Sequence, residues 1–171
     1  MNIFVTSFNQ LQAVKHLDDL RLNKMILETA LMLSTSYRIL FGDNEQVYKT
    51  SFLNHPCTIW ARKNIYTYSW LVDYFDAAAK EKYYRDSTIK KNVNMHLSYI
   101  KLYKIFNTKY NQDYKEKISN DFFDFNCTDF KEEKNIIKAY QQYMNKKWNN
   151  DLRSPKWTGN NIPSFFYKAT K

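Results

Sequence analysis

The stretch of residues 16–38 constrains the fold most, because it carries the pattern of one long, largely apolar helix. Nearly every turn holds Leu, Met, Ile or Ala, which is typical of a helix that packs against other parts of a protein on most of its sides. Asp18 or Asp19 is a suitable N-cap, and Phe41-Gly42-Asp43 ends the pattern. The sequence therefore predicts a long buried helix that runs to about Leu40.

Polar residues on this helix fall on one line instead of scattering. At about 100° per residue they lie within roughly one quarter of the circumference, with only Leu31 intruding. The members are Arg21, Lys24, Glu28, Thr35 and Arg38. One reading is a surface salt bridge between Lys24 and Glu28, although Lys before Glu is the weaker order. The other is a carboxylate held by cations in a groove, where the cations favour its ionised form and can bind phosphates.

Four further segments have helical spacing, and the fold class that follows is all-α. We expect a compact single-domain helical bundle over residues 1–171, with a short extended N-terminal segment at residues 1–7. We see no linker and no internal repeat. An irregular aromatic C-terminal tail follows the last helix and either wraps the bundle or hangs free. The expected helices are Asn9–His16, one helix within Asn54–Arg85 that opens at Pro56 after Asn54 or His55, Val93–Tyr110, and a helix from Asp129, with Glu132 as capping-box partner, to about Trp148.

Glycine is scarce, and this excludes several nucleotide-binding classes. The chain has two glycines, Gly42 and Gly159, whereas a P-loop or a dinucleotide-binding loop needs several within a few residues. The formal net charge is +9, and the excess lies in residues 51–171 instead of in one arm. A broad basic surface with 14 Tyr and 4 Trp favours a polyanion partner, nucleic acid first, although AT-rich coding also produces such a composition.

The two cysteines, Cys57 and Cys127, predict neither a disulfide framework nor a metal site. His55 and Cys57 are too close in sequence for a usual structural pair, and Cys127 alone does not complete four ligands. We therefore expect no metal and no cofactor. No stretch approaches the roughly 18 apolar residues of a membrane span, and no targeting segment is evident. The expectation is a reduced, cytoplasmic protein without a membrane partner.

Several other residues have the chemistry of a nucleic-acid site. His16 and His55 are candidates for catalysis or DNA contact, while His96 reads as structural or surface. Basic residues next to aromatic rings suit phosphate contacts combined with base stacking or wedging. The candidates of this kind include Arg62, Arg85 and Trp157. Core aromatics with solvated basic residues are the alternative reading for most of them.

A metal-dependent nuclease is a further reading of the same region. Asp18, Asp19 and Glu28 are close in sequence and are the kind of ligand that Mg²⁺ prefers. Adjacent residues of a helix do not face each other, however, and N-capping accounts for the two aspartates.

Four motifs together resemble a known family. The chain starts with MNIF, KHLDDLR leads into the long helix, this helix contains KMILETA, and the next helix opens with NHPCTIW. This resembles the phage endonuclease V-type pyrimidine-dimer DNA glycosylases, and is similar in particular to a phage group with these motifs. The order of elements agrees over most of the chain, and the sharp motifs cover about residues 14–38 and 54–62.

The resemblance implies a DNA glycosylase/AP lyase that needs no metal and acts on double-stranded DNA. The family's nucleophile is the α-amine at the chain start, which attacks the sugar C1′, expels the damaged base and forms an imine. A carboxylate on the first long helix stabilises that cation and moves protons. By position, Glu28 is that carboxylate, Arg21 and Lys24 hold phosphates, and His16 and His55 match histidines of the family.

The sequence departs from the family at two places. The family loses its initiator Met and exposes the amine of a small residue, whereas the bulk of Asn2 blocks this removal, so the amine belongs to Met1. The carboxylate lies further along the helix than in the family, so its assignment to Glu28 rests on the polar line. The alternative function is a non-catalytic basic helical protein of a phage that binds nucleic acid, and a phage enzyme would act in the cytoplasm of the infected host.

Overall fold

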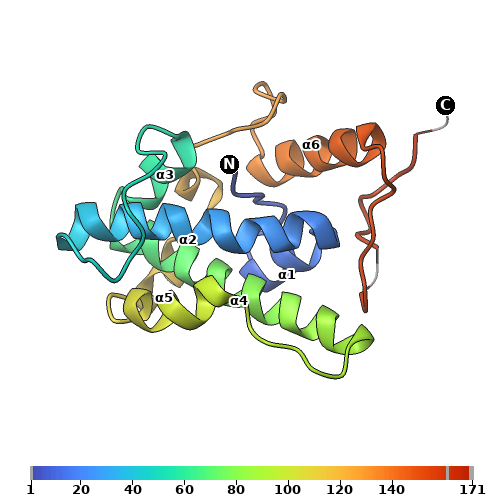
Figure 1. The fold of residues 1–171 in the computed structure, drawn as a ribbon. Coiled ribbons are helices and arrows are strands. Elements are labelled where there is room, and N and C mark those ends of the chain that lie inside the picture. Colours follow the sequence, from blue (N-terminus) through green and yellow to red (C-terminus); the bar gives the residue numbers. More distant parts are fainter. Residues whose placement is uncertain (1, 161, 170–171) are drawn as a thin grey trace.

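The helix α2 (Asp19–Phe41) crosses the middle of the molecule and packs along α4 (Ile65–Ile89) (Figure 1). The computed structural model describes residues 2–160 and 162–169. In this part of the chain all regular elements are helical. The others are α1 (Gln10–Lys15), α3 (Pro56–Ala61), α5 (Leu97–Asn107), the 3-10 turns η1 (Gln112–Lys117) and η2 (Asn120–Phe122), and α6 (Ile136–Asn150).

The N-cap expected for the long helix is confirmed, and the short helix before it has an N-cap of its own. The Asn9 side chain accepts a hydrogen bond from the Gln12 N–H at the start of α1, and Asp18 caps α2 by accepting from the Arg21 N–H. Gly42 ends α2 with a φ of 97°, a left-handed conformation that favours glycine. The long buried helix therefore forms where its apolar pattern predicts it.

The single helix expected within Asn54–Arg85 is wrong, because the structure divides it into α3 and α4. The expected helix is interrupted before Asn64, which caps α4. Its side-chain oxygen accepts from the N–H groups of Tyr66 and Thr67 at 2.9 and 3.0 Å. Thr67 bonds back to the Asn64 backbone, which completes a capping box. His55 caps α3, as one of the two expected residues.

The last two helices start later than expected. His96 caps α5, whose bounds are narrower than Val93–Tyr110. The Asp129–Glu132 pair does not form a capping box, and α6 instead starts after Asn135, whose side chain accepts from the Lys138 N–H at 3.0 Å. Residues 129–135 form bends and a turn, in which Asp129 pairs with Lys146 of α6 and the Glu133 carboxylate accepts from the Asn135 N–H at 2.9 Å.

The N-terminal segment lies between α2 and α6 (Figure 1) and joins them. Ile3 and Val5 are fully buried, and the Phe4 ring packs edge-on against Tyr140 of α6 with centroids 6.4 Å apart. This segment is thus part of the core, as its apolar residues predict.

The described part of the C-terminal tail, residues 151–160 and 162–169, packs against the helical bundle. The Trp157 ring packs edge-on against Trp148 of α6, with ring centroids 5.1 Å apart. Its indole N–H donates to the backbone oxygen of His16 at 2.9 Å. Thr158 donates to Asp19 at the start of α2. Of the two predictions for the tail, the one in which it wraps the bundle is confirmed. The molecule is a compact all-α domain, and no helix of the described residues has the length and apolar character to cross a membrane.

Candidate active site

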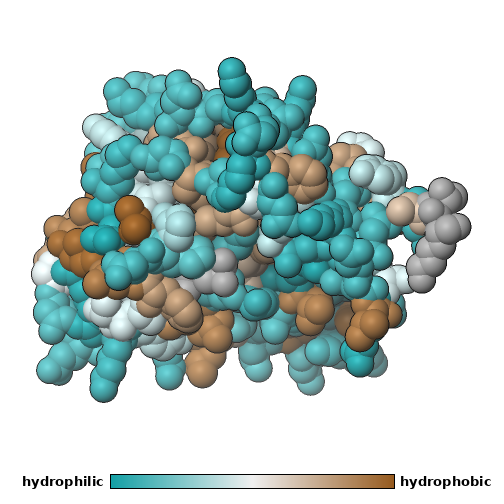
Figure 2. Space-filling view, turned by 90° about the horizontal axis from the view of Figure 1, so that it is seen from above, coloured by the Kyte–Doolittle hydropathy of each residue, from teal (hydrophilic) through white to brown (hydrophobic). Residues whose placement is uncertain are grey.

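A pocket of about 330 Å³ lies where α2, α6, the start of α3 and the N-terminal segment meet. Figure 2 looks onto the side of the molecule that carries α3 and α6, and most exposed groups there are hydrophilic. The pocket is lined by Asn2, Phe4, Leu20, Arg21, Lys24, Met25, Glu28, His55, Cys127, Tyr143 and Lys147. It therefore collects the first half of the polar line of α2 together with residues far away in the sequence.

Glu28 is the shielded carboxylate of this pocket. Its side chain is 14% exposed, and one oxygen, Oε1, lies 3.2 Å from the ammonium nitrogen of Lys24, whose own side chain is 69% exposed. The other oxygen, Oε2, accepts from the backbone N–H of Asn2 at 3.3 Å. Lys24 and the Asn2 N–H therefore contact different oxygens of the same carboxylate.

The Asn2 side chain fixes the first described residue in place. Its amide oxygen accepts from the N–H of Ile3 at 2.8 Å and from the hydroxyl of Tyr140 at 2.9 Å, and lies 3.7 Å from the Cys57 sulfur. Burial raises the pKa of Tyr140 well above its usual range, so this hydroxyl keeps its proton and remains a donor. Asn2 thus links α6 and α3 beside Glu28.

Cations line the pocket from both α2 and α6. Lys147 of α6 lies over the Tyr143 ring, 5.0 Å from its centroid, and sequence reasoning did not single it out. Arg21 is held by two carboxylates, Asp18 at 2.9 Å and Asp151 at 2.8 Å, which compensate its charge. The positive charges best available to a ligand here are therefore those of the lysines.

The second half of the polar line serves the loop between α2 and α3 instead. The Thr35 hydroxyl exchanges hydrogen bonds with the backbone of Ser51, and Arg38 donates to the backbone oxygens of Val47 and Tyr48 and pairs with Asp43. These two residues hold a loop and do not line the pocket.

His55 and the two cysteines meet at the pocket wall. The Nδ1 atom of His55 accepts from the Cys57 N–H at 3.2 Å, and the sulfurs of Cys57 and Cys127 are 3.7 Å apart. This contact lowers the pKa of Cys127, while burial raises that of Cys57. Sequence spacing did not bring Cys127 into this group, since 70 residues separate the cysteines.

His16 and Trp157 lie outside the pocket and are joined by a hydrogen bond. Nδ1 of His16 is 3.0 Å from the Thr6 hydroxyl, and the imidazole ring packs edge-on against Phe165. Burial lowers the pKa of His16. Trp157 is 8% exposed, and its indole N–H donates to the backbone oxygen of His16.

Arg85 and Arg62 also have partners within the fold. Arg85 is 2% exposed and donates to Glu81, to Asp19 and to the backbone oxygens of residues 15 and 17. It ties the junction of α1 and α2 to α4. Arg62 is half-buried at the end of α3 and donates to the Leu53 oxygen at 3.4 Å. Neither lines the pocket.

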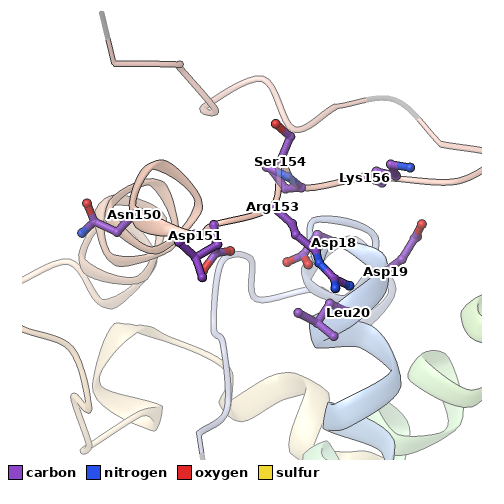
Figure 3. Close-up of a pocket in the computed structure, with 10 residues that line it drawn as sticks. Asp18, Asp19, Leu20, Asn150, Asp151, Arg153, Ser154 and Lys156 are labelled. Atoms are coloured by element: carbon purple, nitrogen blue, oxygen red, sulfur yellow. The ribbon is translucent and has the colours of Figure 1, made fainter. Parts of the chain in front are cut away.

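A larger pocket of about 650 Å³ lies between the start of α2 and the chain after α6 (Figure 3). Its aspartates are engaged with protein groups: Asp18 accepts from the Trp148 indole at 2.9 Å and pairs with Arg21, and Asp19 accepts from Thr158. Glu28 is not among its lining residues. The three carboxylates of the metal-nuclease reading therefore do not line one pocket.

Comparison with known proteins agrees with the motif resemblance. The profile of the family described as pyrimidine dimer DNA glycosylase matches residues 1–95, which include Asn2, Glu28 and His55 but not Cys127 or Lys147. No curated protein and no solved structure matches the chain. The family match covers more than half of the sequence and assigns a DNA glycosylase type of function with DNA as substrate. The chain belongs to the pyrimidine dimer DNA glycosylase family.

Proposed function

We propose that the protein is a DNA glycosylase/AP lyase that acts on pyrimidine-dimer-type damage in double-stranded DNA. The α-amine of Met1 is the nucleophile, and Glu28 is the carboxylate that transfers protons. Met1 lies outside the described residues. The observation that carries the proposal is the 3.3 Å hydrogen bond between the Asn2 N–H and Glu28, because Met1 is bonded to that same nitrogen.

The chemistry suits a terminal amine. The amine nitrogen bonds to C1′, the glycosidic bond breaks and the base leaves; the sugar ring then opens and a C=N bond forms. Loss of a C2′ proton expels the 3′ phosphate. An amine attacks only when neutral, and an α-amine has a reference pKa of about 8 against about 10.4 for lysine. Glu28 stabilises the cationic imine and accepts or returns protons.

The pocket's cations bind the phosphates beside the lesion. Lys24 on α2 and Lys147 on α6 lie on two walls of the pocket, which suits a strand that passes between them. Arg21 is a further and weaker phosphate contact, because two carboxylates already compensate its positive charge. His55 contacts the extruded nucleotide from the third wall. Extrusion and bending of the duplex bring C1′ within reach of the amine.

The remaining candidates have other roles. We leave His16, Arg38, Arg85 and Trp157 out of the DNA-contacting set, because their polar atoms bond within the fold. Arg62 stays a proposed phosphate contact at the margin of the site. Encoded by a phage, the enzyme would act in the cytoplasm of an infected bacterium.

A duplex with one site-specific pyrimidine dimer tests this function. With EDTA present, to exclude a Mg²⁺-dependent nuclease, we expect cleavage of the glycosidic bond of one dimer pyrimidine, which stays attached to its partner base, and strand cleavage that leaves an unsaturated aldehyde on the 3′ end. The matching undamaged duplex should stay intact. Tight, steeply salt-dependent binding without glycosidic-bond or strand cleavage would contradict the proposal and favour a non-catalytic nucleic-acid-binding protein.

A further inference from the structure

Three side chains with metal-binding atoms come together at the wall of the pocket. His55 and Cys57 lie on either side of Pro56 at the start of α3, and Cys127 follows η2. One ligand atom from each of the three lies within 4.8 Å of the others. The proposed glycosylase chemistry uses neither sulfur, so the grouping calls for its own explanation.

The distance between the two sulfurs fits a shared metal ion better than a disulfide. Cys57 Sγ and Cys127 Sγ are 3.7 Å apart. A disulfide requires about 2.05 Å. Two thiolates on a tetrahedral Zn²⁺, each at about 2.3 Å from the metal, are roughly 3.8 Å apart by the geometry of the tetrahedron. The observed spacing corresponds to that edge.

The surrounding fold places both sulfurs without help from a metal. The backbone N–H of Cys127 donates to the Tyr140 hydroxyl at 3.3 Å, which attaches its loop to α6. Cys57 is fully buried in the first turn of α3, and its sulfur lies beside the Asn2 amide oxygen. Two different helices thus hold the two thiols against each other, which is the preorganisation that a metal site needs.

We propose that His55, Cys57 and Cys127 bind one Zn²⁺ ion. Thiolate and imidazole are ligands that zinc prefers. The Nδ1 lone pair of His55, which now accepts the Cys57 N–H, binds the metal instead, and the thiols release their protons.

Three protein ligands leave a fourth coordination position. Because His55 and Cys127 both line the pocket that contains Glu28, this position faces a space open to water or to a phosphate oxygen. The ion also ties α3 to the segment at Cys127, and so braces one wall of the pocket. The site does not depend on the glycosylase proposal.

Metal titration of the reduced, metal-free protein tests the site, with Zn²⁺ and with Co²⁺ as a spectroscopic probe. We expect one ion per chain, and for Co²⁺ the visible bands of a tetrahedral ion together with thiolate-to-metal charge transfer. Cys127→Ser should weaken Zn²⁺ binding by more than about 100-fold, since even hydrogen-bond partners of metal ligands contribute about 10- to 100-fold. Far-UV circular dichroism checks that this variant is folded.

His55 has a matched control elsewhere in the chain. His55→Asn keeps an N-cap for α3 but removes the imidazole, and should weaken Zn²⁺ binding by about 10-fold or more. His96 caps α5 in the same way, through Nδ1 at 3.2 Å from the Ser98 N–H, so His96→Asn should leave the affinity unchanged. Equal affinities of the wild type and the Cys57→Ser and Cys127→Ser variants would overturn the proposal. So would a Co²⁺ spectrum without thiolate charge transfer, or a Cys57–Cys127 disulfide in protein purified without oxygen.

Discussion

The backbone N–H of Asn2 donates to Oε2 of Glu28 at 3.3 Å, although 26 positions separate the two residues. This bond joins the start of the described chain to the middle of α2 inside a pocket lined by lysines from two helices. The proposed terminal-amine mechanism needs its nucleophile and its carboxylate in one place, and this contact supports the choice of Glu28 as that carboxylate.

Removal of the Glu28 charge should abolish most of the activity. Glu28→Gln keeps the size of the side chain but cannot accept a proton, so we expect single-turnover cleavage of a dimer-containing duplex to fall by about 10²- to 10⁴-fold. Glu45→Gln makes the same charge change on an exposed loop residue and should cleave at the wild-type rate. Similar rates for all three proteins would remove Glu28 from the mechanism.

Asn2→Ala should lower stability through the Tyr140 hydroxyl. This buried donor loses its acceptor, which costs about 1–3 kcal/mol of the free energy of unfolding, measurable by urea denaturation. Asn92→Ala, on the exposed connection between α4 and α5, is the control. The double variant with Tyr140→Phe should lose less than the sum of the two single changes; simple additivity would show that the hydrogen bond contributes nothing.

Lys24 and Lys147 should each contribute one phosphate contact. Lys24→Gln and Lys147→Gln are expected to weaken binding to duplexes of any sequence, and each should reduce the salt slope of log K by about 1. Lys101→Gln, an exposed change on α5, should preserve both the affinity and the slope. Fluorescence anisotropy over a series of salt concentrations gives these slopes, and unaltered slopes in the pocket variants would place the DNA elsewhere.

Arg85 should affect folding and not DNA affinity. Arg85→Met removes one partner of a buried network and leaves Glu81 without its cation, so we expect a loss of about 3–5 kcal/mol in the free energy of unfolding. Whatever fraction remains folded should bind DNA with wild-type affinity. A folded, stable variant with impaired DNA binding would instead restore Arg85 to the DNA-contacting set.

His16 should make stability depend on pH. Burial lowers its pKa in the folded protein below the usual value of about 6.5, so the unfolded chain takes up the proton first. This contribution to stability is complete above about pH 6.5 and is lost as the pH falls towards the folded-state pKa. In His16→Gln the free energy of unfolding between pH 7.5 and 5 should fall less steeply than in the wild type. An equal fall in both proteins would assign the dependence to other groups.

Helices with a clear apolar period and a capping residue could be predicted from the sequence. α2, with Asp18 as N-cap and Gly42 at its end, is the best case, because both end signals are local. The division of α3 from α4 was missed because the apolar pattern continues across Asn64, although Asn64 with Thr67 is a recognisable capping pair. The start of α6 was misplaced because Asp129 and Glu132 have the letters of a capping box but no apolar face after them.

The part of the site that could be predicted lies on α2, together with His55, which the NHPC motif singles out. Arg21, Lys24 and Glu28 follow from the period of α2, whereas Lys147 and Cys127 reach the pocket through tertiary packing that no local pattern encodes. The polar line itself was over-extended, because helical spacing cannot tell a residue that faces a pocket from one, such as Arg38, that holds a neighbouring loop. The burial of Arg85 and Trp157 could not be predicted either, because Arg and Trp are residue types that often contact DNA.

Borohydride trapping tests the central claim most directly. The wild-type protein is incubated with a duplex that carries a pyrimidine dimer or an abasic site, the imine is reduced to a stable amine, and the adduct is located by intact mass and peptide mapping. We predict one covalent adduct on the α-amine of Met1. An adduct on an internal lysine, or none on either duplex with DNA binding retained, would contradict the assignment of the terminal amine as nucleophile.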